Sequence, residues 1–391
     1  MEELLIKYKN LCDWITHHGG FVNHKLKIEQ TEKFGRSIVT SQQMEVGEEL
    51  FKLPKELHLN PETTGLSKYN LGEHFEYRDQ VVISLLFECQ NPDTKWRPYV
   101  MLLPQLKEFE SHPMVIFYQN KFPNFSQDIL SRVSALYQSF NNFYVKLQHY
   151  NSQVNKIFNV VPNFNECIWA FLTVITRMWA NAGLVPFADM LQHSNDSKIY
   201  LDTIGANFSI MTTKSVTPAG SVIFDNYFVQ DDITLYVNFG FVEVSPITHL
   251  SVGFQFETKN TLIASIINTE RNKFQNKRIY LSTEGINQDL IGFLRLHLLD
   301  ANDLKIANFE NDQFFLQLIT LANELRCLQK LKNRLNFLIE PKELEFIEAN
   351  FNNYEELTPE WSVCKLIKNI DQLKKVCDNY IDEYWKSFLS V

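Results

Sequence analysis

Hydrophobic and polar positions follow a helical period at the start of the chain, where residues 2–18 place apolar side chains on one stripe before a pair of glycines. This pattern predicts an amphipathic helix that stops at the glycines. Between residues 33 and 54 the pattern changes to short alternating runs separated by glycine turns, which predict short strands. From about residue 72 to 180 the helical period returns, and helices are predicted at 126–149 and 164–180.

The second half of the chain begins with strand-like runs and continues as helices. Strands are predicted at 201–211, 221–224 and 248–256, and long helices at 312–336 and 363–389. We expect a domain boundary near residues 258–262, where the pattern changes. Strands and helices in the first part of the chain, followed by helices alone, predict an α+β fold class with an all-α C-terminal domain.

Composition and charge narrow the class of protein. The chain has 391 residues, enough for two or three domains, and its 45% hydrophobic content is typical of a globular protein. The net charge of −9 argues against a phosphate-binding surface, so we expect no nucleic-acid partner. A basic protein or peptide partner fits better, although an acidic balance is also common in proteins without one.

Cysteine usage and apolar run lengths indicate the compartment. The cysteines are Cys12, Cys89, Cys167, Cys327, Cys364 and Cys377, and none form a C-x-x-C pair. We therefore expect neither a disulfide framework nor a cysteine-based metal site, and a reducing, cytoplasmic compartment. The acidic N-terminus does not have the basic-then-apolar order of a signal peptide, and no run of 18 apolar residues occurs, so no membrane span is expected.

Polar, potentially reactive side chains interrupt the apolar runs between residues 169 and 242. Five motifs follow one another along the chain. They are the turn Gly35-Arg36-Ser37, the residues Trp96, Pro98 and Tyr99 before Leu103-Pro104, the pair Thr176-Arg177, the segment 184–193 with Asp189 and Gln192-His193, and the segment 227–241 from Tyr227 to Phe241. Their order resembles the SET-domain protein methyltransferases, in particular the split-SET subgroup that includes the Rubisco large-subunit lysine methyltransferase and the actin-histidine methyltransferase.

The resemblance implies a β-rich SET domain with a pseudoknot, interrupted by a helical insertion and followed by a helical domain. It divides the chain into an N-terminal helix with the first part of the SET domain at 1–71, the insertion at 72–165, the second part of the SET domain at 166–258, and a substrate-binding domain at 259–391. It also implies S-adenosylmethionine (AdoMet) as the cofactor. The implied partner is a non-histone protein substrate, bound by a monomer.

Site residues follow from the positions that match the motifs. AdoMet carries a carboxylate, for which a guanidinium is well suited, and an adenine that needs an apolar wall. The resemblance implies cofactor binding by Gly35, Arg36, Arg177, Asp189, Gln192, His193, Tyr227 and Phe241. It implies catalysis by Tyr227, whose hydroxyl would orient the amine, and by the position that Phe239 occupies.

Three positions depart from the family pattern. Ser37 replaces a glycine, Gln192 replaces the asparagine before His193, and Phe239 replaces the usual catalytic tyrosine and so removes a hydroxyl. The leading hypothesis is an AdoMet-dependent protein-lysine N-methyltransferase. A protein-histidine N-methyltransferase and a catalytically degenerate binding module remain as alternatives. Asp231 and Asp232 are predicted to form a solvated turn or a helix cap.

Overall fold

A computed structural model describes most of the chain. The described residues are 2–32, 34–121, 127–202, 208–227, 231–243, 249–250, 261–270, 274, 281–282, 285–307, 311, 314–338, 344–345, 347, 351–353 and 359–389. They form two compact units, each made of two chain segments. The first unit comprises Met1–Glu110 and Leu136–Phe228, and the second comprises Ser111–Ala135 and Val229–Val391.

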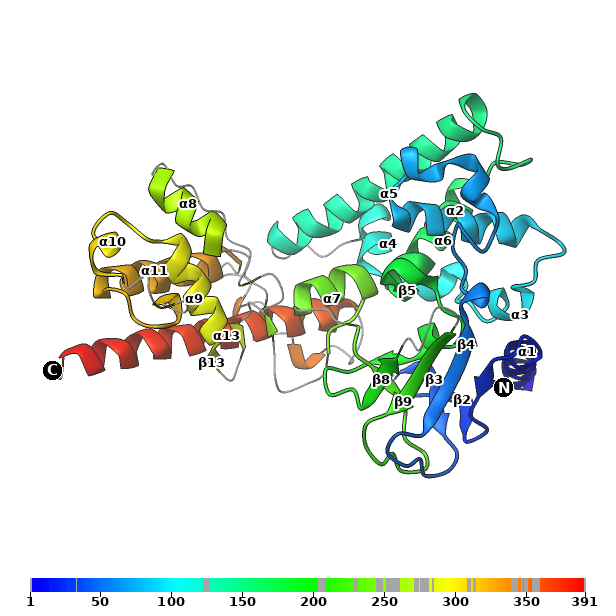
Figure 1. Ribbon diagram of the computed structural model, residues 1–391, viewed down its shortest axis with the longest axis horizontal. Coiled ribbons are helices and arrows are strands. Elements are labelled where there is room, and N and C mark those ends of the chain that lie inside the picture. Colours follow the sequence, from blue (N-terminus) through cyan, green and yellow to red (C-terminus); the bar gives the residue numbers. More distant parts are fainter. Residues whose placement is uncertain are drawn as a thin grey trace. The chain divides into compact units, whose positions relative to one another are not determined.

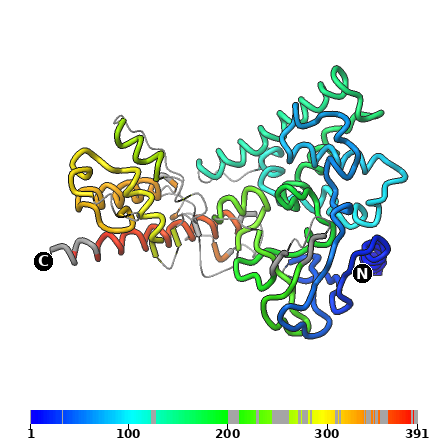
Figure 2. Tube along the Cα trace, in the orientation of Figure 1, coloured from blue at the N-terminus to red at the C-terminus, as the bar shows by residue number. Residues whose placement is uncertain are grey.

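The first unit is built around an antiparallel sheet with the strand order β1-β4-β9-β8. Its strands are β1 (Phe21–Val22), β4 (Glu49–Pro54), β8 (Ile199–Asp202) and β9 (Phe208–Thr213). Strands β4 and β9 are distant in sequence but pair with Lys52 opposite Ile210, so the blue and green traces run side by side (Figure 2). The single strand predicted at 201–211 was wrong, because β8 and β9 are two antiparallel strands. A pattern of apolar positions does not reveal where such a run reverses.

Short strand pairs complete the sheet structure of the first unit. They are the hairpin β2 (Leu26–Thr31) with β3 (Gly35–Thr40), the antiparallel pair β5 (Met178–Trp179) with β6 (Gly183–Leu184), and the parallel pair β7 (Gln192–His193) with β10 (Phe224–Asp225). Gly183 has φ +80°, and a Cβ there would lie 2.5 Å from the carbonyl oxygen of Leu59. Only glycine therefore allows this close crossing, which directs the chain toward the predicted site.

Helices flank these strands in the first unit (Figure 1). They are α1 (Glu2–His17), α2 (Tyr77–Gln90), α3 (Arg97–Val100), the part of α5 (Gln127–Gln153) from Leu136 onward, and α6 (Phe164–Arg177). The 3₁₀ helices are η1 (Lys55–Leu57), η2 (Leu66–Tyr69), η3 (Leu71–Glu73), η4 (Leu106–Phe109), η5 (Ala180–Ala182) and η6 (Ala188–Met190).

Helix α6 has a clear beginning and end. A reciprocal capping box between Asn163 and Glu166 starts it, with the Glu166 amide donating to Asn163 Oδ1 at 3.1 Å. The helix ends at Arg177 and not at the predicted residue 180, because Met178 and Trp179 form β5. Its buried face packs against α2, and this packing fixes the position from which the Arg177 side chain leaves the helix.

The second unit is mainly helical. Its elements are α4 (Pro113–Tyr118), α7 (Asp232–Phe239), β11 (His249–Leu250), α8 (Thr261–Glu270), β12 (Leu281–Ser282), β13 (Gly285–Ile286), α9 (Gln288–His297), α10 (Asp303–Ile306), η8 (Phe314–Leu316), α11 (Leu321–Leu338), η9 (Phe351–Asn353) and α13 (Pro359–Leu389). A core of Phe274, Phe314 and Phe315 with neighbouring aliphatic residues joins α8, α9 and η8. The buried Arg295 guanidinium pairs with both oxygens of Glu324 and so connects α9 to α11.

Several predicted elements of this unit change in detail. The helix predicted at 312–336 begins only at Leu321, because the Thr320 hydroxyl accepts the amide of Asn323 and acts as its cap. Of the strand predicted at 248–256, only His249–Leu250 lies within the described residues. None of the described helices is both long and apolar enough to cross a membrane.

The adjacent aspartates at the start of α7 have different surroundings. Asp231 is the N-cap, since its carboxylate accepts the Thr234 amide at 2.8 Å, and the predicted cap is confirmed. Asp232 was predicted to be solvated, but it is buried and accepts a hydrogen bond from Asn369 of α13 at 3.0 Å. The correction arises because α13 covers the first turn of α7.

Candidate active site

Two of the predicted residues meet where α6 ends. Arg177 Nη1 donates to the backbone carbonyl of Asp189 in η6 at 2.5 Å and lies 4.0 Å from its Oδ2. The β5–β6 hairpin turns the chain back between them, so a helix end and a 3₁₀ turn come into contact. The Asp189 side chain is fully buried, whereas that of Arg177 is 23% exposed. Of the pair, Arg177 is therefore the member that a ligand can reach.

The Asp189 carboxyl has one oxygen with a partner and one without. The fully buried Tyr99 donates its hydroxyl to Oδ2 at 2.5 Å. Among the described residues, Oδ1 of Asp189 and Nε of Arg177 are buried without a hydrogen-bond partner. Burial raises the pKa of Asp189 to about 6, against the opposing influence of Arg177 and Tyr99. Unpaired buried groups of this kind are costly unless a ligand or water completes them.

The backbone just before Asp189 is strained. Phe187 has φ +75°, a conformation that a bulky residue rarely adopts. Its buried ring lies 5.3 Å from the ring of Phe51 and 6.2 Å from that of Tyr8, and this packing holds the strained backbone. Strain maintained by surrounding packing is a feature often found at functional sites.

The opening turn of β3 is joined to β7 by a side chain. Gly35 has φ +64°, as a tight turn requires, and the next carbonyl, that of Arg36, accepts the side-chain amide of Gln192 at 2.8 Å. The long arm of Gln192 thus spans the two strands. The structure places these three predicted residues together.

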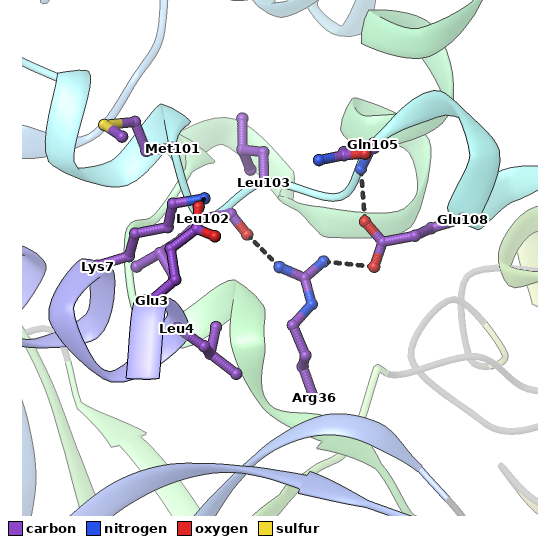
Figure 3. Close-up of a pocket in the computed structure, with 9 residues that line it drawn as sticks. All are labelled: Glu3, Leu4, Lys7, Arg36, Met101, Leu102, Leu103, Gln105 and Glu108. Carbon is purple, nitrogen blue, oxygen red and sulfur yellow. Dashed lines mark hydrogen bonds and ion pairs between the residues drawn. The ribbon is translucent and has the colours of Figure 1, made fainter. Parts of the chain in front are cut away.

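The Arg36 side chain lies in a small hollow of about 240 Å³ (Figure 3). Its guanidinium donates to the carbonyl of Leu102 at 2.8 Å and to Glu108 at 2.9 Å. Burial lowers the pKa of Arg36, while the Glu108 carboxylate opposes this shift. The Arg36 side chain thus binds residues of the insertion, while the backbone carbonyl of Arg36 accepts a hydrogen bond from Gln192.

His193 and Tyr227 form the third contact among the predicted residues. His193 Nδ1 accepts the backbone amide of Tyr227 at 3.1 Å, and the two ring centroids are 5.0 Å apart. Burial lowers the pKa of His193 to about 4, so its ring is neutral near pH 7 with the proton on Nε2. The Tyr227 hydroxyl donates to the carbonyl of Leu191 at 2.7 Å, and burial raises its pKa. Tyr227 therefore presents a fixed, protonated hydroxyl.

Phe239 and Phe241 belong to the second unit, whereas the other predicted site residues belong to the first. Their rings meet edge to face with centroids 6.4 Å apart, on either side of Gly240. Gly240 ends α7 with φ +84°, and its amide donates to the Tyr236 carbonyl at 2.9 Å. The αL conformation of this glycine sets the directions of the two phenylalanines.

Two residues of the insertion were missed by sequence reasoning. Tyr99 holds Asp189 from within a motif that had been assigned no chemical role. The buried His112 donates from Nε2 to the carbonyl of Asn238 at 3.1 Å, and its Nδ1 accepts the Met114 amide, so it fixes the end of α7. Burial lowers the pKa of His112 to about 4. A tyrosine between two prolines was a sequence signal that could have indicated a role for Tyr99. No pattern in the sequence pointed to His112.

Comparison with known proteins begins with sequence relatives. No model of a known protein family matches the chain. SET domain-containing protein 4 of Artemia parthenogenetica is 25% identical over 60% of this chain and 62% of its own length. The chloroplastic [fructose-bisphosphate aldolase]-lysine N-methyltransferase of Arabidopsis thaliana is 24% identical, over 62% of this chain and 54% of its own length. The N-lysine methyltransferase SETD6 of Homo sapiens is 25% identical, over 54% of this chain and 49% of its own length. The chain spans about half to three fifths of the length of the curated relatives it matches.

Solved structures extend the likeness over nearly the whole chain. The SET domain of LSMT bound to lysine and AdoHcy matches 97% of this chain and 92% of its own, with a TM-score of 0.65 and 15% identity. Rubisco LSMT bound to AdoMet gives the same coverage and TM-score. The predicted resemblance to SET-domain proteins and the α+β fold class are confirmed. The chain has the SET-domain fold of LSMT.

Proposed function

We propose that this chain, which has the fold of the SET domain of Rubisco LSMT, is an AdoMet-dependent protein-lysine N-methyltransferase with a non-histone protein substrate. The observation that carries the proposal is the arrangement at the end of α6, where a partly exposed Arg177 is held against the buried Asp189. Two of the sequence relatives are lysine methyltransferases, and solved LSMT structures contain AdoMet or lysine, which supports the same chemistry here.

The residues at the end of α6 fit the amino-acid portion of AdoMet. Arg177 Nε is a buried donor without a partner and Asp189 Oδ1 a buried acceptor without one, among the described residues. A carboxylate is the natural complement of the Arg177 guanidinium, which is 23% exposed, while the buried Asp189 balances its charge. Gly35, Arg36, Gln192 and His193 are proposed to hold the remainder of the cofactor. When bound, AdoMet supplies an electrophilic methyl group on a sulfonium.

Tyr227 is proposed to orient the target amine. Its hydroxyl donates to the Leu191 carbonyl at 2.7 Å, which fixes the position of the phenol oxygen. The neutral His193 holds the Tyr227 backbone amide and adds no charge that would compete with the cation. A phenol oxygen held in one position favours an in-line approach of the amine. Phe239 and Phe241 are proposed, on the resemblance alone, to provide an apolar wall for the lysine stem and the adenine.

A protein-histidine N-methyltransferase is the second candidate. Phe239 favours it, because the actin-histidine branch also lacks a tyrosine at this position, whereas Ala188 favours the lysine-modifying members. A degenerate SET protein that binds a partner without methyl transfer is the third candidate, since Phe239 provides no hydroxyl.

The oligomeric state, domain division and compartment that we propose are those expected from the sequence. We propose a monomer whose mainly helical residues 259–391 bind the protein substrate, after a SET domain divided at 1–71 and 166–258 by the insertion at 72–165. We also propose a reducing cytoplasmic compartment, because the cysteine spacing in the sequence is not that of a disulfide framework.

Calorimetric titration with AdoMet tests the proposal first. We expect saturable binding, and its absence at millimolar AdoMet would eliminate both enzymatic candidates. A cell lysate incubated with the chain and methyl-radiolabelled AdoMet should then show a labelled protein band. Hydrolysis of that band should release methyl-lysine. Release of methyl-histidine would replace the leading candidate with the second, and binding without labelling would support the third.

Restoring the missing hydroxyl tests the role of Phe239. We expect Phe239→Tyr to raise the rate of lysine methylation about tenfold, the factor that one added hydrogen bond of roughly 1.4 kcal/mol gives in a transition state. Initial rates with the labelled substrate provide the measurement. Phe239→Leu is the control, since it replaces the aromatic ring by another apolar side chain and adds no hydroxyl. No gain with tyrosine would mean that the surroundings of Phe239 are adapted to phenylalanine.

A further inference from the structure

We propose that Tyr99, a residue of the helical insertion, is a positioning residue for cofactor binding: its buried hydroxyl holds the Asp189 carboxylate, against which Arg177 is oriented. This role rests on the proposed function, because it requires that Arg177 binds AdoMet. It adds a residue of the insertion to a site that the motifs placed entirely in the SET segments.

The segment that carries Tyr99 is fixed at both ends. The indole of Trp96 donates to the Leu57 carbonyl at 2.9 Å, and the indole of Trp169 on α6 donates to the Pro104 carbonyl at 2.7 Å. Between these anchors Tyr99 has 0% exposure. Its hydroxyl therefore has a defined position, set by packing and not by the partner that it holds.

The hydrogen bond from Tyr99 fixes the orientation of the Asp189 carboxyl group. Because Oδ2 accepts the Tyr99 hydroxyl at 2.5 Å, rotation of the carboxyl would break a buried hydrogen bond. Oδ2 is therefore held in place on the side of Arg177, and Oδ1 is buried without a partner among the described residues. Arg177 bonds the Asp189 backbone carbonyl and lies 4.0 Å from Oδ2, so its orientation depends on both the backbone position and the negative charge of Asp189.

The charged and titratable groups around Asp189 determine how this arrangement responds to pH. Arg177 from α6 and Arg36 from β3 favour the carboxylate, as does the hydrogen bond from Tyr99 of α3. Tyr227 is also electrostatically coupled to Asp189. Burial opposes all of these and raises the pKa of Asp189 to about 6. Protonation of Asp189 removes the attraction for Arg177, so AdoMet affinity is expected to rise with pH through this value.

Removing the Tyr99 hydroxyl should move this pH dependence. A hydrogen bond to a charged carboxylate corresponds to a shift of about one pH unit, so Tyr99→Phe should raise the midpoint of the affinity profile by about that amount. We expect affinities within about twofold of the unsubstituted chain at pH 8.5, roughly threefold weaker at pH 6.5 and roughly eightfold weaker at pH 5.5, the ratios of ionised Asp189 that such a shift gives.

The experiment measures the AdoMet dissociation constant of the full chain by calorimetry from pH 5.5 to 8.5. The matched control is Tyr150→Phe, because Tyr150 is also buried and donates its hydroxyl at 2.6 Å, but to the Tyr69 carbonyl. A purely structural loss should affect both variants alike and leave the midpoint in place. Ionisation of the cofactor itself is common to all variants and cancels in the comparison.

Asp189→Asn provides a second test that does not depend on the folding of Tyr99→Phe. It should abolish the pH-dependent step near pH 6 and leave weak binding throughout. A step that persists in Asp189→Asn, or a midpoint that moves equally in Tyr99→Phe and Tyr150→Phe, would overturn the role of Tyr99 while leaving the proposed function intact. Absence of AdoMet binding by the unsubstituted chain at every pH would instead overturn the proposed function, and this role with it.

Discussion

At the scale of single residues, Gln192 shows how a departure from a family motif can have its own structural purpose. An asparagine arm is shorter by one methylene, whereas the glutamine reaches the Arg36 carbonyl at 2.8 Å and joins β7 to the start of β3. In the sequence, Gln192 is seen only as a departure from the family pattern. The structure shows that the extra length forms a hydrogen bond between two strands that both carry proposed cofactor residues.

We predict that Gln192→Asn lowers the free energy of unfolding by about 1 kcal/mol, the net value of one partly buried neutral hydrogen bond. Urea-induced unfolding provides the measurement. Gln90→Asn is a suitable control, because Gln90 makes a comparable bond of 2.9 Å to the Val160 carbonyl at an exposed position. Equal losses of unfolding free energy in the two variants would show that the hydrogen bond of Gln192 stabilises the fold no more than the exposed one of Gln90.

At the scale of elements, α7 and α13 are joined by a buried polar contact. Asn369 donates to Asp232 at 3.0 Å, and its own Oδ1 is buried without a partner among the described residues. Burial raises the pKa of Asp232 to about 7, the Asn369 hydrogen bond lowers it, and the nearby Asp231, Glu243 and Lys365 contribute smaller effects. A neutral Asp232 could donate to the free oxygen of Asn369, whereas a carboxylate could not.

We predict that Asp232→Asn raises the melting temperature at pH 8 and raises it clearly less at pH 5. The folded-state pKa lies above the unfolded value, so the contribution of Asp232 to stability is fully present below about pH 4 and is lost as the pH rises through about 7. The amide removes this loss because it cannot ionise.

Scanning calorimetry at the two pH values measures the effect of Asp232→Asn. Asp231→Asn serves as the control, since asparagine caps a helix about as well as aspartate. Removing the Asp231 charge relieves only one of the smaller effects on Asp232, so its gain at pH 8 should be well below that of Asp232→Asn. An unchanged melting temperature of Asp232→Asn at pH 8 would contradict the prediction.

At the scale of the whole molecule, buried titratable groups act in opposite directions. His58, His112 and His193 each have a pKa lowered to about 4 by burial, so the stability that they contribute above pH 6.5 is lost as the pH falls toward 4. Asp189 and Asp225, with pKa values raised to about 6, favour folding at lower pH. Each unit contains groups of both kinds, and their effects partly cancel between about pH 4 and 6.5.

The sequence by itself determined the elements that depend on local period and the motifs that depend on residue order. Apolar spacing located α1 and α13 nearly to their ends, and the order of five motifs led to the SET-domain fold. These features are encoded within short segments, so they can be recognised without knowing how the segments meet.

Only the tertiary structure decided which side chains share an environment. Tyr99 and Asp189 are 90 positions apart, and Asp232 and Asn369 are 137 apart, so no local pattern reports either contact. The same limit explains why Asp232 was expected to be solvated and why β8 and β9 were predicted as one strand. Burial and partner choice arise from long-range packing, and these decide whether a carboxyl is a solvated cap, a buried acid or the support of a binding arginine.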